Sequence, residues 1–157
     1  MSNQCSNNQC QGKRAVSGLG VLALRLLLAW EFFQSGLTKL EGTNWFDQIQ
    51  DQFPFPFNLL PADLNWGLSM GAELILPFLL VFGLLTRFSS LVLLTVLFVA
   101  WYSLHAASGY NVCDNGYQLV LTYSVMLLPL LMQGAGSLSV DAFLRSKFSH
   151  HSWSKFL

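Results

Sequence analysis

The sequence predicts an all-α membrane protein: a four-transmembrane-helix bundle with a long outer loop between helices 1 and 2. Hydrophobic residues make up 53% of the 157 residues and charged residues only 10%, whereas soluble domains carry about 25% charged residues. Four segments approach the roughly 20 apolar residues that a spanning helix needs; they are residues 15–38, 66–85, 88–108 and 117–133. Because irregular backbone cannot face lipid, these segments are expected to form helices.

The chain is expected to hold one domain, residues 15–136, because the four apolar segments take up more than half of its length. Residues 1–14 are rich in Asn, Gln and Ser, and this composition predicts a disordered cytoplasmic tail. Residues 137–157 form a cytoplasmic C-terminal segment. In this segment we expect a short amphipathic helix that starts at Ser139 or Asp141.

The lysine and arginine residues are distributed unevenly over the two sides of the predicted bundle. Cytoplasmic loops carry an excess of these residues in membrane proteins. Only Lys39 falls on the outer side, and the basic residues that share the other side are Lys13, Arg14, Arg87, Arg145, Lys147 and Lys155. The sequence therefore predicts a multi-pass protein of a bacterial inner membrane with both termini in the cytoplasm. This distribution reflects topology and is no signal for nucleic-acid binding.

The outer loop, residues 41–65, is the longest connection and is rich in aromatic residues and proline. The alternating prolines of Phe53-Pro54-Phe55-Pro56-Phe57 exclude an α-helix and favour an extended path. Aromatic side chains are enriched where a membrane meets water. We therefore expect the loop to lie in the outer interface or to fold over the mouth of the bundle.

Several ionisable residues lie inside the apolar segments, where such residues normally face the protein interior and mark functional sites. Glu31 and Glu73 lie at similar depth, roughly 10 Å below the outer surface at 1.5 Å rise per residue. Ser35 follows Glu31 by one helical turn, and Tyr123 lies in the outer half of the fourth segment. We predict a buried polar site in which the two carboxylates face each other. If they are close, at least one should carry a proton, because like charges in a low dielectric disfavour double ionisation.

A polar stripe at helical spacing supports this site; it consists of Glu31, Gln34, Ser35, Thr38 and Lys39. The alternative is a hydrogen-bonded pair of carboxyl groups that only fixes the helix register. Arg25 also belongs to the predicted polar site, but we expect its long side chain to extend to the inner surface. Gly67 and Gly71 form a GxxxG motif, which is typical of close helix approach.

Three residues could hold a metal near the outer mouth: Cys113, His105 and Met70. Thiolate, thioether and imidazole groups together suit Cu(I). The alternatives are a turn residue for Cys113, a hydrogen-bonded interfacial residue for His105 and a packing residue for Met70. Cys5 and Cys10 are expected to be reduced thiols of the cytoplasmic tail. The sequence contains no phosphate loop and no HExxH motif.

Three pieces of the chain resemble the DoxX family over residues 20–145. They are Leu24-Arg25-Leu26 through Trp30-Glu31-Phe32 to Leu40, Glu73 with the Gly83-Leu84-Leu85-Thr86-Arg87 turn, and the run from Gly134 to Asp141. A narrower resemblance, to the HvfX-type subgroup, rests on residues 44–46, 50–61 and 109–116. That subgroup is encoded beside copper-binding, ribosomally made peptides and the iron oxidases that modify them. The wider family is linked to membrane redox complexes, including quinone-linked sulfur oxidation.

The resemblance implies a four-helix cytoplasmic-membrane protein, and three hypotheses for its function stay open. The first is an accessory protein that handles copper or a copper-binding peptide, in contact with that peptide or its modifying proteins. The second is the membrane subunit of an oxidoreductase, in which Glu31 or Glu73 and Tyr123 exchange protons with a quinone. The third is a non-catalytic scaffold that anchors another protein through the outer aromatic loop.

The topology can be tested with reporter fusions. Reporters placed after Gly42 and after Asn115 should both read outside, because six of the seven basic residues counted above lie on the opposite side. An inside reading at either position would contradict the predicted orientation.

Overall fold

The computed structural model describes residues 2–105, 109–112 and 116–147. This part of the chain is helical and contains no strand, so the all-α prediction is confirmed. The long helices are α1 (Ser2–Glu41), α2 (Ala62–Phe82), α3 (Thr86–Ala100) and α4 (Gln118–Gln133), followed by the short α5 (Val140–Lys147). A π-helical segment, η4 (Trp101–His105), continues α3. Three short 3₁₀ helices lie between α1 and α2: η1 (Phe46–Gln48), η2 (Gln50–Gln52) and η3 (Phe57–Leu59).

Three of these helical stretches are long and apolar enough to cross a membrane: Gly18–Glu41, Ala62–Phe82 and Thr86–His105. The fourth, α4, is apolar but has only 16 residues, or about 24 Å at 1.5 Å per residue. The hydrocarbon core of a bilayer is about 30 Å thick. Four complete membrane spans therefore stay a prediction. The chain is nevertheless a membrane protein with several apolar helices.

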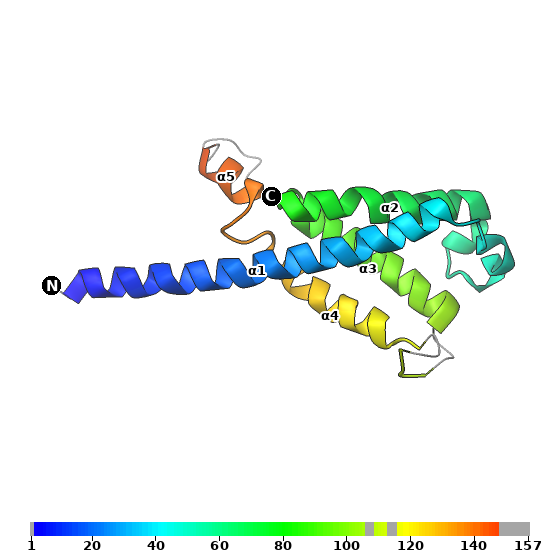
Figure 1. The fold of residues 1–157 in the computed structure, drawn as a ribbon, viewed down its shortest axis with the longest axis horizontal. Coiled ribbons are helices and arrows are strands. Elements are labelled where there is room, and N and C mark those ends of the chain that lie inside the picture. The colour runs from blue at the N-terminus through cyan, green and yellow to red at the C-terminus, as the bar shows by residue number, and fades with distance from the viewer. Residues whose placement is uncertain (1, 106–108, 113–115, 148–157) are drawn as a thin grey trace.

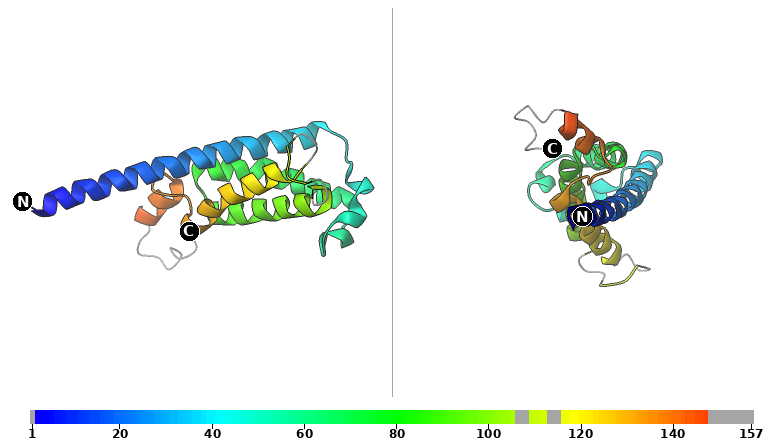
Figure 2. Two further views of the ribbon diagram at one scale, coloured as in Figure 1. Left: turned by 90° about the horizontal axis from the view of Figure 1, so that it is seen from below. Right: turned by 90° about the vertical axis from the view of Figure 1, so that its left-hand side faces the viewer.

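The four long helices run alternately up and down, so their ends meet at two places (Figure 1). We call the end that carries residues 42–61 the loop end, and the end that carries Gly83–Leu85 the hairpin end. α1 packs along α2, and α3 packs along α4 (Figure 2). All four contribute to one core, whose buried residues are Leu28, Ala29, Phe32, Leu76, Leu80, Leu93, Leu97, Leu127 and Leu130.

The N-terminal part of α1 extends beyond the other helices at the hairpin end (Figure 1). The helix begins at Ser2, so the structure differs from the disordered tail that residues 1–14 predict by composition. Helix propagation explains the difference, since each added residue gains one backbone hydrogen bond on a helix that is already nucleated by its packed part.

Residues 42–61 turn back over the loop end, and their path is not the extended one that the prolines predict. The carbonyl of Pro54 accepts the N–H of Phe57 at 2.8 Å, and that of Pro56 accepts the N–H of Leu59 at 3.1 Å. The proline φ angle, near −65°, also suits such 3₁₀ turns. Phe46 and Phe53 are buried against Ala62, with Trp66 packed beside them. This aromatic cluster holds the segment against the start of α2.

At the hairpin end, Arg25 binds the ends of neighbouring helices. Its side chain is 1% exposed. The guanidinium donates to the carbonyls of Leu80 at 2.7 Å, Val81 at 2.7 Å, Ala135 at 2.8 Å and Leu138 at 2.9 Å. The expectation that Arg25 extends to the inner surface is therefore wrong. The last carbonyls of a helix lack intrahelical donors and carry partial negative charge, which makes them a suitable environment for a buried guanidinium.

Replacing Arg25 should destabilise the fold more than replacing the exposed Arg87. Arg25→Met would remove the guanidinium from four carbonyls. The Leu80 carbonyl would still accept the N–H of Gly83, but the other three would lose their donor, and each buried carbonyl left unsatisfied costs about 1–3 kcal/mol. We expect a loss of about 3 kcal/mol or more in the free energy of unfolding, with Arg25→Lys intermediate because an ammonium cannot reproduce the guanidinium fork.

The matched control is Arg87→Met. Arg87 makes one exposed hydrogen bond, to the carbonyl of Met132, so its loss should cost less than about 0.5 kcal/mol. Thermal unfolding of the purified proteins in detergent measures both. Equal melting temperatures for the two Met variants would contradict a stabilising role of the Arg25 hydrogen bonds.

Candidate functional site

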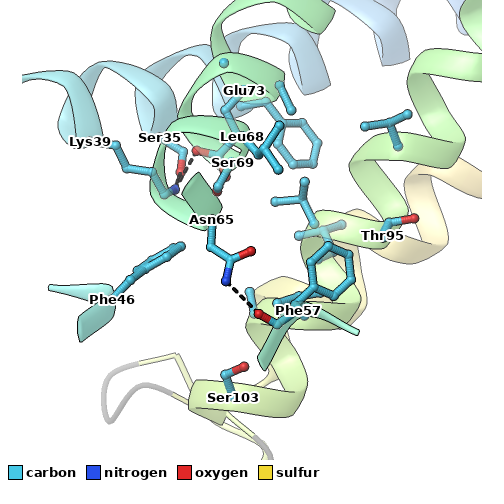
Figure 3. Close-up of a pocket in the computed structure, with 18 of the residues that line it drawn as sticks. Ser35, Lys39, Phe46, Phe57, Asn65, Leu68, Ser69, Glu73, Thr95 and Ser103 are labelled. Atoms are coloured by element: carbon cyan, nitrogen blue, oxygen red, sulfur yellow. Dashed lines mark hydrogen bonds and ion pairs between the residues drawn. The ribbon is translucent and has the colours of Figure 1, made fainter. Parts of the chain in front are cut away.

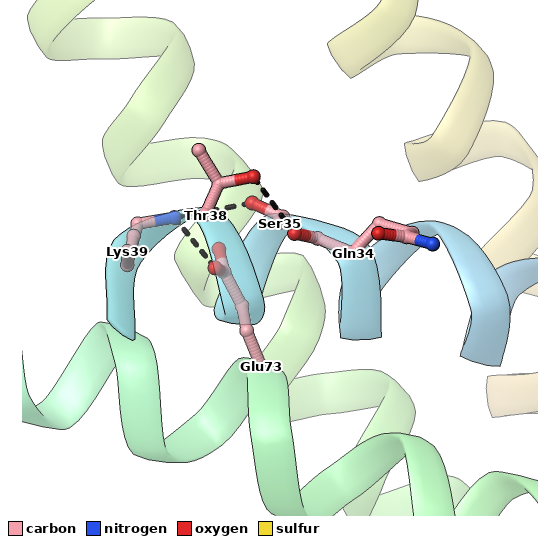
Figure 4. Close-up of polar contacts among 5 residues, drawn as sticks. All are labelled: Gln34, Ser35, Thr38, Lys39 and Glu73. Atoms are coloured by element: carbon pink, nitrogen blue, oxygen red, sulfur yellow. Dashed lines mark hydrogen bonds and ion pairs between the residues drawn. The ribbon is translucent and has the colours of Figure 1, made fainter. Parts of the chain in front are cut away.

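One face of α1 presents Glu31, Ser35 and Lys39 at intervals of one helical turn, and all three line a cavity in the half of the bundle near the loop end. Gln34 and Thr38 belong to the predicted polar stripe but do not line the cavity within the described part of the chain. The Thr38 hydroxyl instead donates to the Gln34 carbonyl at 3.0 Å. Figure 4 shows the side chains from Gln34 to Lys39 on this part of α1 and how Glu73 extends from α2 to meet Lys39.

Lys39 and Glu73 form an ion pair between α1 and α2. The Lys39 Nζ atom lies 2.5 Å from Glu73 Oε2 and donates to Ser35 Oγ at 3.1 Å. The two charged side chains are 16% and 6% exposed. Charges buried to this degree need a partner, since an isolated one would lose its solvation without compensation. Lys39 supplies that partner for Glu73.

Close packing of α1 on α2 places this ion pair. A Cβ added to Gly36 would lie 3.0 Å from the backbone carbon of Glu73 and 2.9 Å from a methyl group of Leu74. Only a residue without a side chain fits at this distance. Gly36 thus brings the backbones together one turn from Lys39, and the lysine can reach across to Glu73.

Glu31 has a different partner, Tyr123 of α4. The Tyr123 hydroxyl donates to Glu31 Oε2 at 2.8 Å. The Tyr123 ring also contacts Phe32, with ring centroids 6.1 Å apart. The two carboxylates therefore line one cavity, but each has its own partner rather than the other carboxylate.

The cavity has a volume of about 800 Å³ and receives residues from all four long helices and from the segment at the loop end (Figure 3). Its wall is mostly apolar, as shown by Phe46, Phe53, Leu76 and Val92. The polar groups are a minority of the lining, and they come from all four long helices and from η4. This combination of an apolar wall with a small number of placed polar groups is typical of small-molecule sites.

Residues of both α2 and α3 line the cavity. These helices meet at the hairpin end and diverge towards the loop end (Figure 1). Ile75 on α2 and Phe88 on α3 line the cavity and are also exposed on the outside of the bundle, by 62% and 56%. In a membrane this outside surface faces lipid. The cavity is thus open sideways, while the aromatic cluster covers it at the loop end.

Gly67 and Gly71 line the cavity instead of allowing a close helix approach. A Cβ built on either residue meets no atom within 4 Å. The prediction from the GxxxG motif is therefore wrong within this chain. Gly36 makes the close approach, and the missing side chains of Gly67 and Gly71 leave space.

The predicted metal ligands are not brought together in the described part of the chain. His105 ends η4 and lines the cavity, whereas Met70 is not among the described lining residues. Cys113 lies outside the described residues. Among the described residues, no group of three or more His, Cys, Asp or Glu side chains is placed to hold a metal ion.

The fold and the cavity together define a helical membrane protein with a polar site buried near one end of the bundle. The DoxX family profile matches residues 20–106, and the chain belongs to the DoxX family. A protein of Haemophilus influenzae named "Uncharacterized protein" is 60% identical over 148 residues, covering 94% of this chain and 98% of that protein. A second protein of the same organism, also named "Uncharacterized protein", is 33% identical over 126 residues, covering 75% of this chain and 85% of that protein. No solved structure matches.

The ion pair predicts a non-additive pair of substitutions. Lys39→Met alone would leave the carboxylate of Glu73 buried without its partner, and breaking a buried pair in this way costs about 3–5 kcal/mol. The double variant Lys39→Met/Glu73→Met removes both charges and should recover most of the lost stability, since an apolar replacement of a buried pair is often neutral.

Thermal unfolding of the parent, both single variants and the double variant measures this coupling. A double variant that melts as low as Lys39→Met would show that the pair does not act as a unit.

Proposed function

We propose that the protein binds a quinone-class lipid in the cavity between α2 and α3 and serves a membrane oxidoreductase as its quinone-binding component. The observation that carries this proposal is the cavity itself, with its apolar wall, its polar groups and its lateral opening. A volume of about 800 Å³ falls in the range of about 300–1,000 Å³ that is typical of ligand pockets.

The lateral opening supports a ligand that is dissolved in the membrane. Such a molecule would enter past exposed apolar side chains, Ile75 and Phe88, without crossing an aqueous surface. An isoprenoid or alkyl tail would remain between the lipid chains, and the ring would lie deeper in the cavity. A water-soluble substrate would instead have to displace the buried aromatic cluster at the loop end.

The paired polar groups support a ligand that exchanges protons. Glu31 with Tyr123, and Glu73 with Lys39, are hydrogen-bonded pairs on the cavity wall. Each pair contains a carboxylate that can accept a proton and a partner that can donate one. Reduction or oxidation of a quinone ring is coupled to such transfers. In this proposal the protein lies in a bacterial inner membrane, with four spans, both termini in the cytoplasm and the loop end outside.

Filling the cavity should abolish ligand binding while the fold persists. Gly71→Leu would place a side chain in the space that lacks any atom within 4 Å of a Cβ. Leucine also has a higher helix propensity than glycine. We expect the affinity for decylubiquinone, measured by equilibrium binding to the full chain in nanodiscs, to fall at least about tenfold, or about 1.4 kcal/mol.

Gly20→Leu is the matched control. Gly20 also has no atom within 4 Å of a Cβ, but it does not line the cavity within the described residues, so this variant should bind as the parent does. Absence of saturable binding to the parent, or equal loss in both variants, would overturn the proposal.

Metal analysis of the same purified sample tests the copper hypothesis. Stoichiometric copper that is lost in Cys113→Ser, together with no quinone binding, would favour an accessory that handles copper or a copper-binding peptide. If the purified protein binds neither metal nor quinone, the scaffold hypothesis remains.

A further inference from the structure

Two buried polar atoms at the loop end of the cavity have no hydrogen-bond partner. They are Asn65 Oδ1 and Ser103 Oγ. Both residues are 6% exposed, and both line the cavity. A buried oxygen that accepts no hydrogen bond is costly, and most such groups in proteins are satisfied by protein, water or ligand. Because both atoms lie on the cavity wall, a ligand in the cavity is the natural hydrogen-bond partner for them.

The orientation of the Asn65 amide is fixed by its neighbours. The amide nitrogen donates to the carbonyl of Phe57 at 2.8 Å, with the carbonyl of Leu60 at 3.5 Å. Backbone carbonyls only accept hydrogen bonds, so the nitrogen must face them and the amide cannot be flipped. Figure 3 shows the nitrogen directed at Phe57 and the oxygen turned away from it. Asn65 therefore offers an acceptor, and not a donor, to anything that approaches its free atom.

The hydroxyls of Thr86, Ser89, Ser90 and Ser103 are all buried without a hydrogen-bond partner, but of these four only Ser103 is on the described cavity wall. Thr95, Thr122 and Ser124 each donate to the carbonyl four residues earlier, at 3.0, 2.8 and 2.7 Å. Ser103 lies in the π-helical segment η4, where the backbone bonds run five residues apart, and its oxygen makes no such bond. π-helical turns of this kind occur frequently at functional sites. The segment thus leaves a hydroxyl available beside the cavity.

We propose that the site prefers the reduced, hydroxyl-bearing form of its ligand, a quinol, over the quinone. Asn65 Oδ1 can only accept a hydrogen bond, and of the two ligand forms only the quinol has ring hydroxyls that donate one. This inference rests on the proposed function and specifies which redox form is held. A quinol ring has O–H donors, whereas a quinone ring has only carbonyl acceptors. The Ser103 hydroxyl can both accept and donate, so it can bind the same ligand oxygen or its neighbour.

The cation at the site does not reverse this preference. The Lys39 ammonium has three N–H donors, and two of them already bind Glu73 and Ser35, so one remains that could donate to a quinone carbonyl. The carboxylates of Glu31 and Glu73 are acceptors, which again suit a ligand with hydroxyl groups. Two buried polar atoms on the described cavity wall have no partner, Asn65 Oδ1 and Ser103 Oγ. Of these, Asn65 Oδ1 has a fixed orientation and is an acceptor.

The test compares binding of decylubiquinol and decylubiquinone to the full chain in nanodiscs under anaerobic conditions. The parent should bind the quinol at least about fivefold more tightly, which corresponds to one net hydrogen bond of about 1 kcal/mol. Ser103→Ala should reduce quinol affinity about fivefold, with a smaller change for the quinone. Because Ser103 Oγ has no protein partner, this variant should melt at or above the parent temperature.

Ser124→Ala is the control, since it deletes a hydroxyl that is already bonded to Val120 and is not on the described cavity wall. It should leave both affinities unchanged. Asn65→Leu should remove the preference altogether. Equal affinities of the parent for the two forms, or a preference for the quinone, would overturn this inference and leave the proposed function intact. Failure of the parent to bind either form would overturn both.

Discussion

The fold depends on the hydrogen bonds of one buried cation, Arg25, to backbone carbonyls of two other parts of the chain. Two of these carbonyls belong to the end of α2, and two belong to the segment between α4 and α5. A charge at this depth is costly unless hydrogen-bonded groups surround it. Satisfying it joins α1, α2 and the end of α4 at the hairpin end. With that end fixed, α2 and α3 can diverge towards the loop end and leave the cavity between them.

The same contact explains why separate pieces of sequence belong together. A Cβ on Gly83, whose φ is +67°, would lie 2.6 Å from Ser139 and 2.8 Å from the Arg25 guanidinium. Asp141 completes the group, since its backbone N–H donates to the Gly83 carbonyl at 3.2 Å. The α1 motif, the α2–α3 turn and the segment after α4 are the three pieces that carry the family resemblance. In the structure they form one cluster around Arg25.

Sequence patterns predicted the elements and the residue types of the site better than their pairing. Apolar length predicted the helices, and the i, i+4, i+8 spacing placed Glu31, Ser35 and Lys39 on one face. The partner of Glu73 was missed because Lys39, although it was placed on the polar stripe, was not considered as an ion-pair partner for a carboxylate. The roles of Gly36 and Gly71 depend on how α2 crosses its neighbours, and spacing alone does not contain that information. Ser103 was missed because no local sequence pattern indicates a π-helical turn.

Arg25 and Lys39, two of the cations of α1, illustrate why one end of the bundle is structural and the other suits chemistry. Arg25 keeps its proton in a protein, and its carbonyl partners cannot take one, so these hydrogen bonds serve to hold the helices together. Lys39 is paired with a carboxylate, and Tyr123 with another; these four groups can exchange protons. They lie on the wall of the cavity that opens towards lipid. Within the described residues, two embedded carboxylates and their hydrogen-bond partners share this cavity wall, so the proposed proton exchange with a membrane-dissolved ligand belongs to the loop end.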